Sequence, residues 1–329
     1  MAKKTPPKKG TKKITRKITK KITRKKIASS KKIKTTSPGD VFSSLLELLR
    51  RTSTELPDDV QKVILEALER EEKNTTAEYA MKIIQDNIAL AKQKSQPLCQ
   101  DTGTVLFYVS HPGNFDQIKF MTMARKAIVK ATELGYLRQN SVNSVTGKSE
   151  PTNLGPGHPS FHFHQHQSAE VQVRVMLKGG GCENVGIQYS LPYAPIEAGR
   201  DMLGVRKVIL DGVVKAQGQG CGPGVLGICI GGDRGSSYLE SKEQLLRKLD
   251  DKNPDPELLK MEEDIVQSCN KLMIGPMGFG GKTTLLSCKI GAQQRVPASF
   301  FVSISYMCWA FRRQGIVLGK NGSIVKWLY

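Results

Sequence analysis

The basic residues of this 329-residue chain are concentrated at its N-terminus. Residues 1–36 contain 16 of the 50 lysines and arginines and none of the 30 acidic residues. A block of like charges repels itself and has too little apolar surface to form a core, so we expect residues 1–37 to be a disordered tail. A fold must therefore come from residues 38–329, in which 34 basic residues nearly balance the 30 acidic ones.

Three interpretations of this tail stay open. It could bind a polyanion such as nucleic acid by neutralising phosphates, direct the chain to an organelle, or be a solvated extension without a partner. The excess of lysine over arginine disfavours organelle targeting. No secretory signal follows the basic start, and no apolar run approaches the roughly 18 residues of a membrane span. We expect a cytoplasmic protein without membrane contact.

Helical and strand-like patterns alternate along residues 38–329. Apolar residues recur at helical spacing after Asp40, after Pro57, and at about 76–92, 115–134, 196–216, 237–249 and 256–272. Alternating or continuous apolar runs predict strands at about 104–109, 170–178, 225–230 and 298–306. This interleaving predicts an α/β (α+β) domain over residues 38–329, with a mixed sheet surrounded by helices.

Three of the seven cysteines lie in settings that suit chemistry better than packing. Cys99 opens the run Cys-Gln-Asp-Thr-Gly, Cys221 stands among four glycines, and Cys308 precedes Trp-Ala after a predicted strand. Three thiolates can hold a four-iron cluster and leave one iron open as a Lewis acid. Such dispersed ligands differ from the compact runs of ferredoxins, and they suit a cluster in a cleft between elements.

The other four cysteines have different surroundings. Cys229 lies in an apolar run, Cys269 in a predicted helix and Cys288 beside two leucines, so we expect these three to pack in the core. Cys182 ends a run of three glycines and is the strongest rival ligand. The odd number and irregular spacing of the cysteines favour free thiols over a disulfide framework.

Two glycine-rich segments are candidates for anion binding. Residues 179–181 are three glycines directly after a predicted strand, where backbone N–H groups can approach an anion. Residues 278–284 resemble a phosphate loop, but Pro276 stands where a Walker A loop requires glycine. We therefore interpret the second segment as an anion-binding loop without a nucleotide, in which Lys282 could contact a carboxylate.

His162, His164 and His166 alternate and would share one face of a strand, near His158. This spacing occurs in some zinc sites, but no cysteine or carboxylate stands at ligand spacing nearby. A polar strand face is therefore the favoured interpretation.

Five motifs together resemble the class I, iron–sulfur fumarate hydratases and the related α subunit of L-tartrate dehydratase. They occupy residues 99–103, 178–184, 221–232, 274–284 and 308–310, and the resemblance covers about residues 40–320. It implies a [4Fe-4S] cluster held by Cys99, Cys221 and Cys308. It also implies reversible addition of water to the double bond of a small dicarboxylate.

The resemblance assigns further site residues. Gln100 and Asp101 would contact the substrate, with Asp101 in acid–base catalysis, and Gly181 would make a backbone contact. Arg138 would bind a substrate carboxylate, for which a bidentate guanidinium is suited. Better-known members of the family carry an active-site histidine where this chain has Val296.

Family enzymes have a second, C-terminal domain with more substrate-binding residues and the catalytic base, whereas this sequence ends at Tyr329. The resemblance therefore implies a separate β subunit that completes the active site, within a homo- or hetero-oligomer. We expect the α subunit of a fumarate hydratase, with the tartrate dehydratase α subunit as the alternative. An inactive polyanion-binding protein on the same fold is the alternative of a different class.

Overall fold

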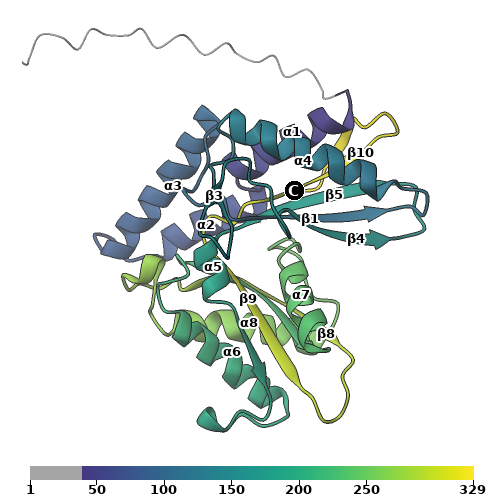
Figure 1. Cartoon of the computed structure of the whole chain (residues 1–329). Coiled ribbons are helices and arrows are strands. Elements are labelled where there is room, and N and C mark those ends of the chain that lie inside the picture. The colour runs from purple at the N-terminus through teal and green to yellow at the C-terminus, as the bar shows by residue number, and fades with distance from the viewer. Residues whose placement is uncertain (1–38) are drawn as a thin grey trace, which may run out of the picture. The chain divides into compact units, whose positions relative to one another are not determined.

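The computed structural model describes residues 39–329, which form helices packed on mixed β-sheets (Figure 1). This architecture confirms the predicted fold class. The predicted tail at residues 1–37, with its expected disorder and its polyanion contact, lies outside the described residues.

The domain begins with three helices, α1 (Val41–Thr54), α2 (Asp58–Arg70) and α3 (Thr76–Lys94). The side chain of Asp40 caps α1 by accepting a hydrogen bond from the N–H of Ser43 at 2.8 Å. Thr75 caps α3 in the same way through the N–H of Glu78. The starts predicted from Asp40 and Pro57 are therefore confirmed.

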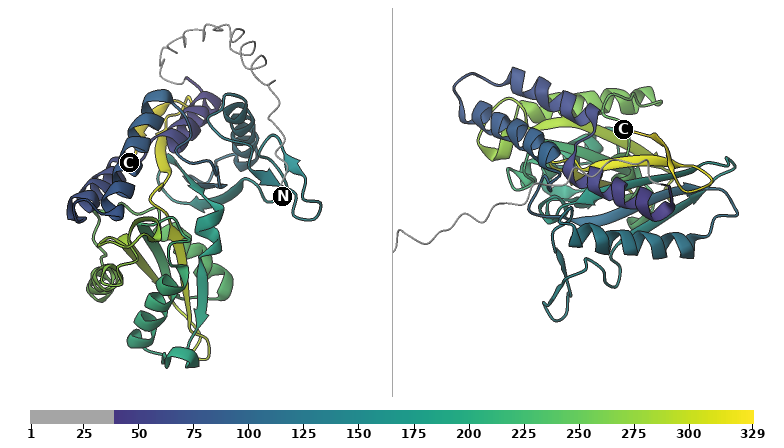
Figure 2. Two further views of the ribbon diagram at one scale, coloured as in Figure 1. Left: turned by 90° about the vertical axis from the view of Figure 1, so that its left-hand side faces the viewer. Right: turned by 90° about the horizontal axis from the view of Figure 1, so that it is seen from above.

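The first sheet has the strand order β11-β10-β5-β1-β4, in which only β1 and β4 pair in parallel. Its strands are β1 (Thr104–His111), β4 (Ser160–Gln165), β5 (Val171–Lys178), β10 (Arg313–Leu318) and β11 (Ile324–Trp327). Helices α1 and α4 (Gln117–Glu133) pack on each other, and their apolar side chains share one core with β1, β5 and β10. Figure 2 shows the N-terminal helices beside the C-terminal strands from two directions.

The second sheet has the order β6-β9-β7-β8. It is built from β6 (Ile187–Ser190), β7 (Gly224–Gly231), β8 (Leu285–Gln293) and β9 (Phe301–Met307), with helices α6 (Met202–Ala216), α7 (Arg234–Gln244) and α8 (Pro256–Asn270). Every residue of β7 is buried, which explains why this central strand has a continuous apolar sequence. As predicted, Cys229, Cys269 and Cys288 are buried in this part of the fold.

The remaining elements are short: β2 (Ser141–Val142), β3 (Ser149–Glu150), α5 (Gly180–Asn184), and the 3₁₀ turns η1 (Ala194–Ile196) and η2 (Pro276–Gly278). The helix expected from about residue 196 begins at Met202, because Asp201 caps it through the N–H of Gly204 at 2.7 Å. Within residues 39–329, none of the helices has both the length and the apolar composition of a bilayer span.

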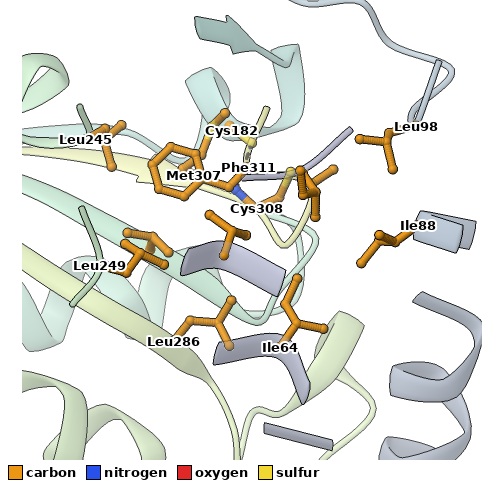
Figure 3. Packing of buried hydrophobic residues seen from close by; sticks show 14 of the residues in the cluster. Ile64, Ile88, Leu98, Cys182, Leu245, Leu249, Leu286, Met307, Cys308 and Phe311 are labelled. Carbon is orange, nitrogen blue, oxygen red and sulfur yellow. Dashed lines mark hydrogen bonds between the residues drawn. The ribbon is translucent and has the colours of Figure 1, made fainter. Parts of the chain in front are cut away.

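A third apolar cluster joins α2 and α3 to the ends of both sheets (Figure 3). It contains Ile64 and Ile88 from the helices, together with Met307, Cys308 and Phe311 at the end of β9. Cys308, the third predicted cluster ligand, therefore follows β9 directly and is packed in this cluster. This packing restricts the positions that its sulfur can take.

A buried ion pair ties α2 to β10. The Arg313 side chain is fully buried and its Nη2 donates to Asp59 Oδ2 at 2.5 Å and to the carbonyl of Arg247 at 3.0 Å. Burial by itself raises the pKa of Asp59, but the charge of Arg313 and its hydrogen bond outweigh burial, so the pKa is lowered.

We predict that Asp59→Asn lowers the free energy of unfolding by about 3–5 kcal/mol, because the buried Arg313 loses its counter-charge. The control is Asp58→Asn, which changes an exposed residue one position earlier in the same helical turn. Because the folded-state pKa of Asp59 is lowered, its stabilisation is present above the unfolded-state pKa and is lost as the pH falls through the folded-state pKa. Denaturant titrations at neutral and acidic pH measure both effects, and equal stability of the two variants would contradict the assignment.

Candidate active site

The carboxylate of Asp101 joins three segments that are distant in the sequence. Oδ1 accepts hydrogen bonds from the N–H of Gly103 at 2.8 Å and from Nδ2 of Asn140 at 2.6 Å. Oδ2 accepts one from the N–H of Gly180 at 2.6 Å. The backbone carbonyl of Asp101 accepts a fourth bond from Arg312 Nη1 at 2.7 Å. The segment that follows Cys99 is therefore fixed against α5 and the start of β10.

Gly179, the first glycine of the run at 179–181, lies in close contact with Asp101. Strand β5 ends at Lys178 and α5 begins at Gly180, so the expected open loop is a short helix. A Cβ atom on Gly179 would lie 3.0 Å from Oδ2 of Asp101 and 3.7 Å from Nη2 of Arg312. The glycine run was predicted to bind an anion. At Gly180 this anion is the carboxylate of Asp101, which belongs to the chain itself.

The structure brings the predicted cysteine ligands into one region. Cys99 follows α3, Cys221 lies between α6 and β7, and Cys308 follows β9. The N–H of Trp309 donates to the carbonyl of Cys221 at 3.3 Å, which joins the second and third cysteine segments. Burial raises the pKa of the Cys221 thiol, and the nearby groups of Cys182, Cys99 and Asp101 raise it further.

The fourth cysteine of this region is Cys182, the rival ligand, which is in direct contact with Cys308. The N–H of Cys308 donates to Sγ of Cys182 at 3.3 Å. Hydrogen bonding by Cys308, chiefly by its thiol, lowers the pKa of Cys182 to about 7; the charge of Lys178 acts in the same direction, whereas burial opposes the shift.

Two buried cations lie beside these thiols. Lys178 is fully buried, and its Nζ donates to the carbonyl of Tyr306 at 2.7 Å and lies 3.8 Å from the carboxylate of Glu183. Burial lowers the pKa of Lys178, while Glu183 and the thiols act in the opposite direction. Arg312 is also buried, and its charge favours the thiolate forms of Cys182 and Cys308.

The glycines around Cys221 are explained by Tyr306, a buried residue near the end of β9. A Cβ atom would lie 2.4 Å from the Tyr306 ring if added to Gly220, and 2.3 Å from it if added to Gly224. Cys221 itself has φ of 54°, a conformation that side-chain-bearing residues rarely adopt. The aromatic ring therefore packs against the turn that holds Cys221.

The second glycine segment also binds a carboxylate from within the chain. The N–H groups of Lys282 and Thr283 donate to the two carboxylate oxygens of Glu71, each at 2.8 Å. Glu71 is 3% exposed and directly follows α2. The same segment supports the cysteine turn, because the N–H of Met277 donates to the carbonyl of Gly222 at 2.9 Å.

A cleft of about 670 Å³ opens beside Asp101, a volume typical of small-molecule sites. Asp101, Asn140, Gly180 and His158 line it together with residues 141–145 of the β2–β3 hairpin. The other predicted substrate-binding residues are Gln100, Arg138 and Gly181, all of which are exposed.

The backbone of Arg138 is fixed by a buried threonine. Its N–H donates to Oγ1 of Thr102 at 2.8 Å, and its carbonyl accepts from the same hydroxyl at 2.9 Å. Thr102 adjoins Asp101, so the predicted carboxylate-binding arginine is anchored directly to the central segment of the site.

Two groups from the sequence analysis lie apart from the cysteines. His164 Nε2 pairs with Glu243 at 3.1 Å, and the ring of His162 stacks on Tyr108, as expected for a polar strand face. Val296 is 64% exposed in the connection from β8 to β9, at the opposite end of β9 from Cys308. The residue at this position therefore lies outside the cysteine site of its own chain.

The donor chemistry of the site fits an iron–sulfur cluster. Within residues 39–329, no three His, Cys, Asp or Glu side chains converge closely enough to bind a single metal ion. The thiolates that hold a four-iron cluster each bind a different iron, so they need not meet at one point. Thiols flanked by the buried cations Lys178 and Arg312 suit an anionic cluster, and Nε of Arg312 has no hydrogen-bond partner among the described residues.

The model of the family described as fumarate hydratase (Fumerase) matches residues 43–317. A Geobacillus stearothermophilus protein provisionally named class I fumarate hydratase is 50% identical over 294 residues, which are 88% of this chain and 57% of the relative. The chain thus spans little more than half the length of that relative.

Two further relatives are named α subunits of L(+)-tartrate dehydratase. The Methanocaldococcus jannaschii protein, whose name is provisional, is 32% identical, and the match covers 82% of this chain and 94% of the relative. The Escherichia coli K12 protein is 27% identical, with 79% of this chain and 85% of the relative covered.

We predict that Asp101→Asn lowers the free energy of unfolding by about 1–3 kcal/mol, because at least one N–H donor loses its acceptor. The matched control is Asp116→Asn, which retains an effective N-cap of the exposed start of α4. Denaturant unfolding of both variants measures the difference. A stability of Asp101→Asn equal to that of the control would show that the Asp101 network does not hold the site together.

Proposed function

We propose that this chain, which belongs to the fumarate hydratase family, is the cluster-binding part of a hydro-lyase that reversibly hydrates fumarate to (S)-malate. The observation that carries the proposal is the convergence of the Cys99, Cys221 and Cys308 segments beside the Asp101 network. The higher identity to the relative named fumarate hydratase favours fumarate over tartrate.

In this proposal Cys99, Cys221 and Cys308 hold a [4Fe-4S] cluster. When bound, such a cluster supplies an iron with an open coordination position that acts as a Lewis acid on a substrate oxygen. Lys178 and Arg312 stabilise the thiolate ligands by placing positive charge in a buried region, where electrostatic interactions are weakly screened.

The chain's own side chains orient the substrate. The exposed guanidinium of Arg138 binds one substrate carboxylate, with its backbone fixed by Thr102. The amide of Gln100 and the N–H of Gly181 add hydrogen bonds that hold the dicarboxylate in one orientation. These three residues are exposed, and they lie outside the lining of the cleft beside Asp101.

Asp101 has two tasks in this proposal. Its three accepted hydrogen bonds position the site, and opening one of them would free a further lone pair for proton exchange. The bond from Asn140 is the one we expect to open, because its donor is an exposed side chain that lines the cleft, whereas the other two donors are backbone N–H groups. We propose that Asp101 exchanges the Asn140 bond for the substrate proton.

A β subunit would supply the remaining substrate-binding residues and the catalytic base, giving a hetero-oligomer. The support is the match of this chain to nearly the whole length of relatives named α subunits. This match also keeps L(+)-tartrate as the second candidate substrate. We place the protein in the cytoplasm, where free thiols stay reduced.

We predict that Cys221→Ser removes the cluster whereas Cys229→Ser keeps it, because Cys229 is buried within β7. Iron and acid-labile sulfide are measured after anaerobic reconstitution, together with the visible charge-transfer absorbance. Wild type and Cys229→Ser are expected to be brown, and Cys221→Ser colourless. A brown Cys221→Ser protein, or a colourless wild type, would contradict the proposal.

A further inference from the structure

We propose that Cys182 and Cys308 form a reversible disulfide when the cluster is absent, and that this bond protects the sulfur of Cys308 from irreversible oxidation. The pairing rests on the contact between these two residues alone. Its protective role rests on the proposed function, because it concerns a proposed cluster ligand.

The first support is direct contact between the two residues. The N–H of Cys308 donates to Sγ of Cys182 at 3.3 Å, and both residues are buried. A disulfide requires close approach of both residues, and this contact places the sulfur of Cys182 against the backbone of Cys308. Figure 3 shows both side chains in the same packed cluster as Met307 and Phe311.

The second support is that the surrounding structure holds the pair together. Lys178 stands four residues before Cys182, and its Nζ donates to the carbonyl of Tyr306, two residues before Cys308. Because Lys178 is fully buried, breaking this bond would leave a desolvated ammonium group without its acceptor. The hydrogen bond from Lys178 to Tyr306 thus holds the ends of β5 and β9 together, close to the two cysteines.

The third support is that Cys182 has no task in the proposed reaction. The three proposed ligands are other cysteines, yet Cys182 is 3% exposed and lies against one of them. Cys182 packs in an apolar cluster, as Cys269 and Cys288 do, but its sulfur also accepts a hydrogen bond from the N–H of a proposed ligand, which packing alone does not explain.

The reaction is balanced with hydrogen peroxide as the oxidant. Peroxide oxidises one thiol to a sulfenic acid, its O–O bond breaks and one water leaves. The second sulfur attacks the first, the S–S bond forms, and the sulfenic oxygen leaves as a second water. Two thiols lose two electrons in total, and one peroxide is reduced to two waters. A thiol reductant reverses the change and frees Cys308 for iron.

The test uses the full chain with its iron removed anaerobically by EDTA in the presence of dithiothreitol, which is then removed by desalting. After limited hydrogen peroxide, free thiols are blocked and peptides are mapped by mass spectrometry without reduction. The expected main product is a peptide pair joined through Cys182 and Cys308, which a phosphine reductant separates. Cys308 joined to Cys99 or Cys221, or left reduced while other thiols oxidise, would overturn the proposal.

The variants test protection separately from the bond. In Cys182→Ser, peroxide is expected to convert Cys308 to sulfinic or sulfonic acid, which reductant does not restore. Cys229→Ser is the control and should form the same disulfide as wild type. If Cys308 of Cys182→Ser stays reducible, the protective role is wrong.

Iron uptake distinguishes this proposal from the proposed function. Peroxide-treated wild type should take up iron only after reduction. If the Cys182–Cys308 bond forms but no form of the chain binds a cluster, the pairing stands and the cluster proposal fails. If reduced wild type binds a cluster but never forms the Cys182–Cys308 bond, the cluster proposal stands and the pairing proposal fails.

Discussion

The site depends on the hydrogen bonds that one carboxylate, that of Asp101, accepts. Asp101 accepts hydrogen bonds from Gly103, Asn140 and Gly180, and its carbonyl accepts one from the buried Arg312. The carboxylate thereby sets the distance between the Cys99 segment and α5, and a side chain at position 179 would contact Asp101 tightly, at 3.0 Å.

A second carboxylate accepts backbone N–H groups of a glycine-rich segment in the same way. Glu71, which is buried after α2, accepts the N–H groups of Lys282 and Thr283, and the loop before these residues supports Gly222. Both glycine segments therefore bind carboxylates of the chain, and both thereby position cysteines. Their sequence patterns indicate anion binding correctly, but the anions come from within the fold. This explains why the second segment resembles a phosphate loop without its full glycine pattern.

Elements with regular periodicity could be predicted from the sequence, and residues held by distant contacts could not. Strand β5 alternates and β7 is continuously apolar, so both were found. Strand β10 was missed because it begins with Arg313, whose charge is buried only through its pairing with Asp59. Asn140 and Arg312 were missed for the same reason, since nothing local in the sequence indicates a partner at Asp101. The contact of Cys182 with Cys308 likewise depends on the junction of two sheets.

In the proposed site, three cysteines hold a cluster with one open iron that binds the substrate. Mössbauer spectroscopy of the anaerobic, ⁵⁷Fe-reconstituted chain, assembled with the proposed β subunit, measures this iron. One iron is expected to differ from the other three, and its isomer shift and quadrupole splitting should change when (S)-malate is added. A larger change with L(+)-tartrate would select the second candidate substrate. Four equivalent irons, or a distinct iron that responds to neither dicarboxylate, would show that the cluster has no substrate-binding iron.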